Sequence, residues 1–494
     1  MSYEITSKKL SDGVDKMNAL GPRYTGSKAH GAFIEDLKKQ VRDMGYEVYS
    51  DPFYFKRWEE KESSLHIIGD EDLEIEVSSA HPYSGLTGDD GITAPLCYVK
   101  NAGDIKNVKD KIAVFEVSNI DFVPSEIAFD KRTSYPEDAL MEAKYEGPVI
   151  TTFVKFVFGM LAKAGKAKAA VFVWKDLHDD CVKGQYLPFI LEYQNLPILW
   201  VDETNGKKLI ESAKANKSAR LVLKGEIEEN AYTETFYCVK KGKKEGESVV
   251  VNTHTDGPNC VEENGPIAII ELMKALKDTE LERTHIFLFT TGHFRLPSFK
   301  AFSTGSFQSV SRWMAMHRPL WDGKNGHLKC VANLTIEHLG CKEWRSIDGE
   351  YKYTGKPDLE LVYTGNEVMD KLYIDTVKEE RTQVRTMTLR GHNMLHFGEG
   401  QNFFTMGVPG ICLVPAPYYL CVESDTHEME KFDAELMREQ TETFLKLIYK
   451  IEKLPADRLG KSDGYSFLKA KSVSGGRDFS LKGFADLLLD KLKK

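Results

Sequence analysis

Several residues that can bind a metal or carry a proton follow one apolar run of the chain. The run VVVNT is followed by His254 and Asp256, and the adjacent acids Glu262 and Glu263 come soon after. Imidazole and carboxylate groups are the usual ligands of hydrolytic zinc. Two neighbouring carboxylates without a metal raise the pKa of one of them, which suits acid–base chemistry. The segment therefore indicates a metal centre or a metal-free acid–base site.

Similar polar groups follow two further apolar runs. His293 comes after FLFTTG, and Glu337 and His338 come after VANLTI. Apolar strands that alternate with helices form mainly parallel sheets covered on both faces. Ligands bind beyond the carboxyl ends of such strands. We therefore expect these groups to converge on one crevice with those that follow VVVNT.

The periodicity of apolar residues predicts the elements that position these groups. Residues 26–44 have apolar side chains at helical spacing and predict an amphipathic helix that Gly45 ends. Short apolar runs between polar turns in 85–225 predict a small β-rich domain. From 226 onward, strands alternate with helices. The fold class that follows is α/β, with a three-layer architecture around a mixed, mainly parallel sheet.

These patterns also divide the chain into domains. Residues 1–84 and 226–455 form one discontinuous domain, and 85–225 are inserted into it. Residues 456–494 carry charged groups and the segment FADLLLDKLKK, which predicts a C-terminal helical tail.

Composition and charge bound the classes of function. The chain has 494 residues, a net charge of -9 and eight cysteines without CxxC spacing. The acidic balance argues against nucleic acid and anionic membranes as partners. No signal-peptide pattern and no apolar run of membrane-spanning length is visible. We expect a cytoplasmic protein with a small-molecule or peptide-like substrate, and we leave a homo-oligomer open.

The ordered motifs of the chain resemble the M28 peptidases, which are zinc-dependent aminopeptidase-like hydrolases, with an inserted protease-associated (PA) domain. The similarity covers most of residues 20–450. It is carried by VVVNTHTDG, EENGPIAIIELMKAL, HIFLFTTGHF, LTIEHLG, MGVPGICLV and ESDTHEMEKFD. The resemblance implies a zinc-exopeptidase type of sheet, a PA-like domain at 85–225 and two zinc ions bridged by a carboxylate.

The resemblance also implies roles for single residues. His254 falls at a histidine ligand, and Asp256 falls at the aspartate that orients it. Glu263 falls at the bridging carboxylate, and Glu337 falls at a further aspartate ligand. Cys421 stands where the last histidine ligand is expected, and a thiolate can bind zinc.

The chain departs from the family pattern at the family's glutamate pair, a base followed by a ligand. His293 and Phe294 stand there, and phenylalanine cannot bind zinc. A shift of one residue in the alignment would put His293 at the ligand position and Gly292 at the base. The departures predict one zinc ion, or none, in place of two, with His293 as base or oxyanion partner.

Three functions follow from these residues. The first is an M28-like hydrolase of an amide-type bond with a single zinc on His254, Glu263 and Glu337. The second is a metal-independent hydrolase, lyase or isomerase in which Glu263 and His293 act as an acid–base pair. The third is a catalytically dead peptidase-like binding protein. Glu262 is a further catalytic candidate, and the candidates for substrate binding are Asn264, His338, Glu399, Gln401 and His427.

Overall fold

The computed structural model describes most of the 494-residue chain. The described residues are 3–118, 130–137, 152–175, 178–182, 189–190, 193–296, 309–392, 396–422 and 427–463. The predicted tail beyond residue 463 and the side chain of Phe294 lie outside the described part. Among the described residues, no helix combines the length and the apolar character needed to cross a bilayer.

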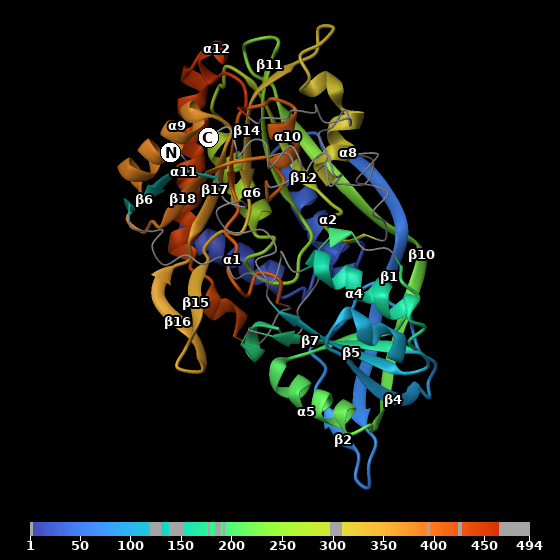
Figure 1. Cartoon of the computed structure of the whole chain (residues 1–494). Helices are drawn as coiled ribbons and strands as arrows, with labels where there is room; N and C mark the ends of the chain where they lie inside the picture. Colours follow the sequence, from blue (N-terminus) through green and yellow to red (C-terminus); the bar gives the residue numbers. More distant parts are fainter. Residues whose placement is uncertain are drawn as a thin grey trace.

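A mixed sheet forms the centre of the larger lobe (Figure 1). Its strands follow the order β10-β12-β11-β14-β19-β17-β18-β6. Parallel pairing joins β12 to β11, β11 to β14 and β14 to β19. The bounds are β6 Asp130–Tyr135, β10 Ser218–Lys240, β11 Glu247–His254, β12 Thr284–Thr290, β14 Lys329–Ile336, β17 Glu360–Thr364, β18 Thr386–Arg390 and β19 Gly410–Leu413. The predicted α/β class with a mainly parallel sheet is confirmed.

Helices cover both faces of this sheet. Val249 and Val251 of β11 pack into one large core with α1, α2, α6, α9 and α11, whereas Val250 faces a second core with α8 and α10. The alternation follows from the period of two in a strand, and it explains why the centre of β11, Val249–Val251, is apolar on both faces. The bounds are α1 Ser7–Asn18, α2 Lys28–Asp43, α6 Gly265–Leu276, α8 Ser309–Met316, α9 Glu367–Glu380, α10 Gln401–Thr405, α11 Ala434–Lys453 and α12 Ala456–Leu459.

A long antiparallel ribbon connects a smaller lobe to the larger one (Figure 1). The ribbon consists of β1 (Tyr49–Ile67) and β10. Four parallel strands form the centre of the lobe, with α5 in the core on one side and α4 in the core on the other. The bounds are β4 Ile92–Val99, β5 Ile112–Ser118, α4 Thr152–Ala164, β7 Ala169–Lys175, β9 Ile198–Val201 and α5 Glu203–Lys214. These six elements fall within 85–225, and the assignment of that segment to the PA type stays a prediction.

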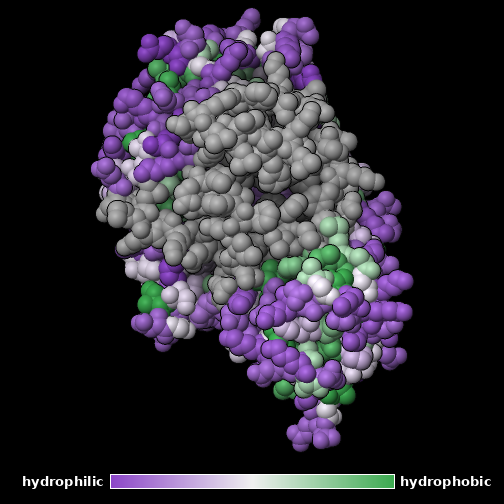
Figure 2. Space-filling model, viewed as in Figure 1, coloured by the Kyte–Doolittle hydropathy of each residue, from purple (hydrophilic) through white to green (hydrophobic). Residues whose placement is uncertain are grey.

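Short strands complete the two lobes. The pairs β8–β13 and β15–β16 form two small separate sheets. The bounds are β2 Leu73–Ile75, β3 Ser79–Ala80, β8 Phe189–Ile190, β13 Phe294–Leu296, β15 Lys342–Ile347 and β16 Glu350–Pro357. On the face shown in Figure 2, the described surface is largely hydrophilic, and hydrophobic residues gather mainly on the smaller lobe.

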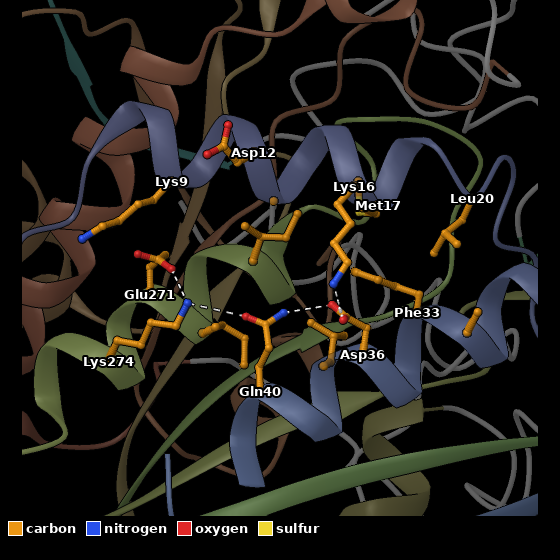
Figure 3. Close-up of a pocket in the computed structure, with 15 residues that line it drawn as sticks. Lys9, Asp12, Lys16, Met17, Leu20, Phe33, Asp36, Gln40, Glu271 and Lys274 are labelled. Atoms are coloured by element: carbon orange, nitrogen blue, oxygen red, sulfur yellow. Dashed lines mark hydrogen bonds and ion pairs between the residues drawn. The ribbon is translucent and has the colours of Figure 1, made fainter. Parts of the chain in front are cut away.

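A cavity of about 440 Å³ lies between α1, α2 and α6 (Figure 3). Apolar residues such as Met17, Phe33 and Ile267 line it together with charged groups such as Lys16 and Glu271. None of the candidate site residues lines this cavity. The cavity is therefore separate from the place where the candidate residues gather.

Candidate metal centre

The candidate residues meet at the carboxyl ends of three parallel strands. His254 is the last residue of β11, and Glu337 and His338 directly follow β14. His293 follows the end of β12. Because β11 is parallel to both neighbours, the three strand ends lie along one edge of the sheet. The structure thus brings four residues from three separate motifs together.

Two of the imidazoles are anchored by main-chain carbonyls. His254 Nδ1 lies 2.9 Å from the carbonyl oxygen of Asp256, and His338 Nδ1 lies 2.6 Å from that of Pro415. A carbonyl oxygen only accepts hydrogen bonds, so Nδ1 must carry the hydrogen in both rings. In the neutral ring, Nε2 then keeps its lone pair. This arrangement is typical of histidines that bind a metal through Nε2.

His293 is anchored by a carboxylate instead. Its Nδ1 donates to Glu399 Oε1 at 2.7 Å, and its ring stacks on His254 with centroids 4.1 Å apart. The main-chain N–H of Glu399 in turn donates to Glu337 Oε1 at 2.6 Å. His293 has a side-chain exposure of 16%, against 0% for His254 and 5% for His338. His293 is therefore the imidazole that faces the solvent side of the cluster.

Glu262 lies at the centre of the three rings. Its Oε1 atom lies 3.7 Å from Nε2 of His254, 3.9 Å from that of His293 and 3.5 Å from that of His338. These separations are longer than ordinary hydrogen bonds. They resemble the spacing of about 3.4 Å between two ligands of one tetrahedral zinc ion with bonds of about 2.05 Å. Glu337 Oε2 extends the cluster, at 4.0 Å from Nε2 of His338.

Two overlapping groups among the described residues could hold a metal ion. One consists of His254, Glu337 and His338, and the other consists of His254, Glu262 and His293. Both need His254, whose Nδ1 is already bonded to a carbonyl. A single remaining nitrogen binds a single ion, so the two groups describe alternative positions and not a pair.

Burial dominates the electrostatics of the cluster. Burial lowers the pKa of His254 well below its usual value and that of His338 to about 3, so both rings favour the neutral form. Burial, and then the charges of neighbouring carboxylates, raise the pKa of Glu262 well above its usual range. Burial alone would lower the pKa of His293, but the Glu399 hydrogen bond and other carboxylates outweigh it, so this pKa is raised.

Glu263 is packed beside Glu262 but has a different partner, and its predicted place as the bridging ligand stays a prediction. Its Oε1 atom accepts a hydrogen bond from Nε of Arg23, and both side chains are fully buried. Burial raises the pKa of Glu263, and Arg23 opposes that rise. Neither metal-capable group of the described residues contains Glu263. The carboxylate that faces the imidazoles is that of Glu262.

Asp256 contacts His254 through its main-chain carbonyl, whereas the prediction concerned its carboxylate. Its carboxylate accepts from the Thr25 hydroxyl at 2.5 Å and from the main-chain N–H of His293 at 2.9 Å. Asn264, a candidate for substrate binding, exchanges two hydrogen bonds with the main chain of Leu339. Asn264 thereby ties the start of α6 to the loop after β14.

The remaining candidates lie at different distances from the cluster. Gln401 is buried at the first position of α10, and Cys421 is buried near enough to Glu262 to contribute to its pKa shift. Neither belongs to a metal-capable group of the described residues. His427 is 70% exposed and pairs with Glu430 at 3.1 Å, so it forms part of a surface turn and not of the cluster.

Two residues of the centre were not predicted in the roles that they have. His338 was expected to bind substrate, yet it belongs to one of the two metal-capable groups of the described residues. Arg23 was not predicted at all, because the local sequence around it, GPRYTG, does not indicate a contact with Glu263, 240 residues away. His293 lies within a metal-capable group, as the shifted alignment would have it.

The chain is similar to solved structures, although no protein-family model and no curated protein matches it. One is a zinc aminopeptidase from Bacillus subtilis, with 16% sequence identity and a TM-score of 0.59. The match spans 92% of this chain and 98% of the aminopeptidase. An M28 peptidase precursor from Shewanella amazonensis covers 91% with 95% of its own, at 13% identity and a TM-score of 0.59. The chain has the fold of the M28 zinc aminopeptidases.

A further structure agrees with this. An aminopeptidase from Aneurinibacillus covers 95% of the chain with 97% of its own, at 13% identity and a TM-score of 0.58. At such identities the likeness concerns the fold. The M28-like fold thus extends over both lobes, and the chemistry has to be argued from the residues of this chain.

Proposed function

We propose that the chain is a metal-dependent hydrolase of amide-type bonds that holds one zinc ion between His254, His338 and Glu337, with Glu262 and His293 beside it. One observation carries the proposal. Two buried imidazoles have their Nδ1 atoms fixed by carbonyls, which leaves Nε2 of each for a metal, and the ligand atoms of His254, His338 and Glu337 lie within 4.8 Å of one another. The aminopeptidases with the same fold, one of them a zinc aminopeptidase, support a hydrolase of this class.

The donor set fits zinc, because neutral imidazole nitrogens and carboxylate oxygens are ligands that this ion takes. A zinc ion bound there supplies a polarised carbonyl and a water of lowered pKa. Glu262, whose Oε1 lies within 3.7 Å of both anchored rings, takes the proton of the attacking water. His293 is held by Glu399, and its raised pKa favours the protonated ring. It faces the solvent side, where it stabilises the developing oxyanion of the substrate or protonates the leaving nitrogen.

A metal-free acid–base enzyme is the second candidate. The observation that favours it is the ion pair between His293 and Glu399 at 2.7 Å, next to a carboxylate whose burial favours the protonated form. Glu263 is held by Arg23, so Glu262 takes its place in the acid–base pair.

Metal content distinguishes these functions. We expect about one zinc per chain in protein purified without chelator or nickel, and we expect His338→Asn to lose it. His285→Asn is the matched control, because His285 is equally buried on β12 but belongs to neither metal-capable group. Hydrolysis of a panel of aminoacyl anilides and N-acyl amides, with and without added zinc, tests the reaction.

Each result has a clear reading. A wild-type protein that neither contains nor takes up zinc contradicts the hydrolase and favours the metal-free enzyme. Zinc bound with no turnover of any amide favours a binding protein. Equal loss of zinc in both histidine variants would show that general destabilisation, and not a lost ligand, removes the ion.

A further inference from the structure

Arg23 joins the N-terminal segment to the candidate centre through several hydrogen bonds of its side chain and main chain. Its Nε donates to Glu263, its Nη1 donates to the carbonyl of Met17 at 3.1 Å, and its Nη2 donates to that of Asn259 at 2.7 Å. Its main chain pairs with Gly257 in both directions, at 2.9 and 3.1 Å. The side chain is fully buried. A buried guanidinium with this many partners fixes whatever it contacts.

The turn that Arg23 holds is the one that carries the two adjacent carboxylates. Asn259 accepts from the main-chain N–H of Glu262 at 3.1 Å, and its amide donates to three carbonyls between 419 and 422. A Cβ at Gly257 would overlap the carboxylates of both Glu262 and Glu263. The turn is therefore packed tightly against both side chains, and it leaves little room for them to exchange places.

We infer that Arg23 is a positioning residue of the zinc site. By holding Glu263 and the turn at 257–259, it keeps Glu262 directed at the three imidazoles. Removal of Arg23 leaves Glu263 as a buried, unpaired carboxylate, which must gain a proton or turn toward another cation. The carboxylate of Glu262 is packed beside that of Glu263 at Gly257, so the two carboxylates would compete for the zinc site. The inference rests on the proposed function, because it concerns the same site.

Zinc affinity of four variants tests this inference. Arg23→Gln removes the charge, Arg23→Lys keeps it without the planar fork, and Arg23→Gln/Glu263→Gln removes both partners. Arg381→Gln is the matched control: Arg381 is likewise a buried arginine, paired with Glu360, and neither residue belongs to a metal-capable group. Zinc affinity is measured by competition with a chromophoric chelator, and stability is measured by urea unfolding of the same zinc-free samples.

We expect Arg23→Gln to weaken zinc binding 10- to 100-fold, the range seen when residues that orient metal ligands are removed. Arg23→Lys should recover part of the loss, and the double variant should recover more, since no unpaired carboxylate is left. Arg381→Gln should lose stability while it keeps the wild-type affinity.

Two results would overturn the inference. One is an unchanged affinity in Arg23→Gln, and the other is an equal loss in Arg381→Gln, which would make the effect one of general stability. A wild-type protein that binds no zinc is a different failure: it overturns the proposed function, and the positioning role with it.

Discussion

Glu262 and Glu263 are neighbours in the sequence, both are buried, and yet they have different partners. Glu262 faces three imidazoles, whereas Glu263 is neutralised by Arg23. In the proposed function, this division gives one carboxylate to the chemistry and leaves the other to the structure. Both glutamates were evident as candidates from the sequence, but the orientation of Glu263 depends on Arg23, 240 residues away.

At this scale, Gly257 decides whether the two carboxylates fit. We expect Gly257→Ala to weaken zinc binding at least tenfold, because the added methyl would overlap both carboxylates. Gly31→Ala is the control, since a Cβ there meets no atom within 4 Å, and it should keep the wild-type affinity. Chelator competition measures both. A wild-type affinity in Gly257→Ala would show that the turn can move without harm to the site.

The elements of the centre could be predicted because their apolar patterns are local. The run VVVNT predicted β11, and helical spacing over 26–44 predicted α2, which spans Lys28–Asp43. The convergence at the strand ends followed from the parallel sheet alone. The sequence could not show that His338, and not Glu263, belongs to a metal-capable group of the described residues. The place of His338 depends on the carbonyl of Pro415, and that of Glu263 depends on Arg23. Both contacts are long-range and leave no local pattern.

The close approach of α1 to α6 gives a prediction at the element scale. A Cβ at Gly13 would lie 2.7 Å from Cγ2 of the buried Ile267. We expect Gly13→Ala to lower the free energy of unfolding by about 1–3 kcal/mol, the usual cost of overpacking. Gly31→Ala, on the open face of α2, should raise it by about 0.5–1 kcal/mol through helix propensity. Urea unfolding of both variants measures the difference, and equal shifts would contradict it.

At the scale of the whole molecule, two lobes are joined through β1 and β10 (Figure 1). The candidate centre lies at the carboxyl ends of β11, β12 and β14 in the sheet of the larger lobe. The deep interior of this sheet also contains ionisable groups that take no part in the centre. His285 is one of them: its Nδ1 donates to the carbonyl of Arg283 at 3.0 Å, and burial lowers its pKa to about 4. Such groups connect the stability of the whole fold to pH.

His285 predicts a loss of stability in mild acid. Between about pH 6.5, where an unfolded histidine titrates, and about pH 4, where His285 titrates in the folded state, the unfolded chain binds more protons. The free energy of unfolding therefore falls as the pH falls through this window, by up to about 1.4 kcal/mol per pH unit from this residue. His285→Asn cannot titrate and keeps an N–H for Arg283, so its stability curve should be flatter by about that slope. Urea unfolding from pH 4.5 to 7 measures the two slopes. An unchanged slope in His285→Asn would mean that the fold opens locally to hydrate this histidine before it unfolds.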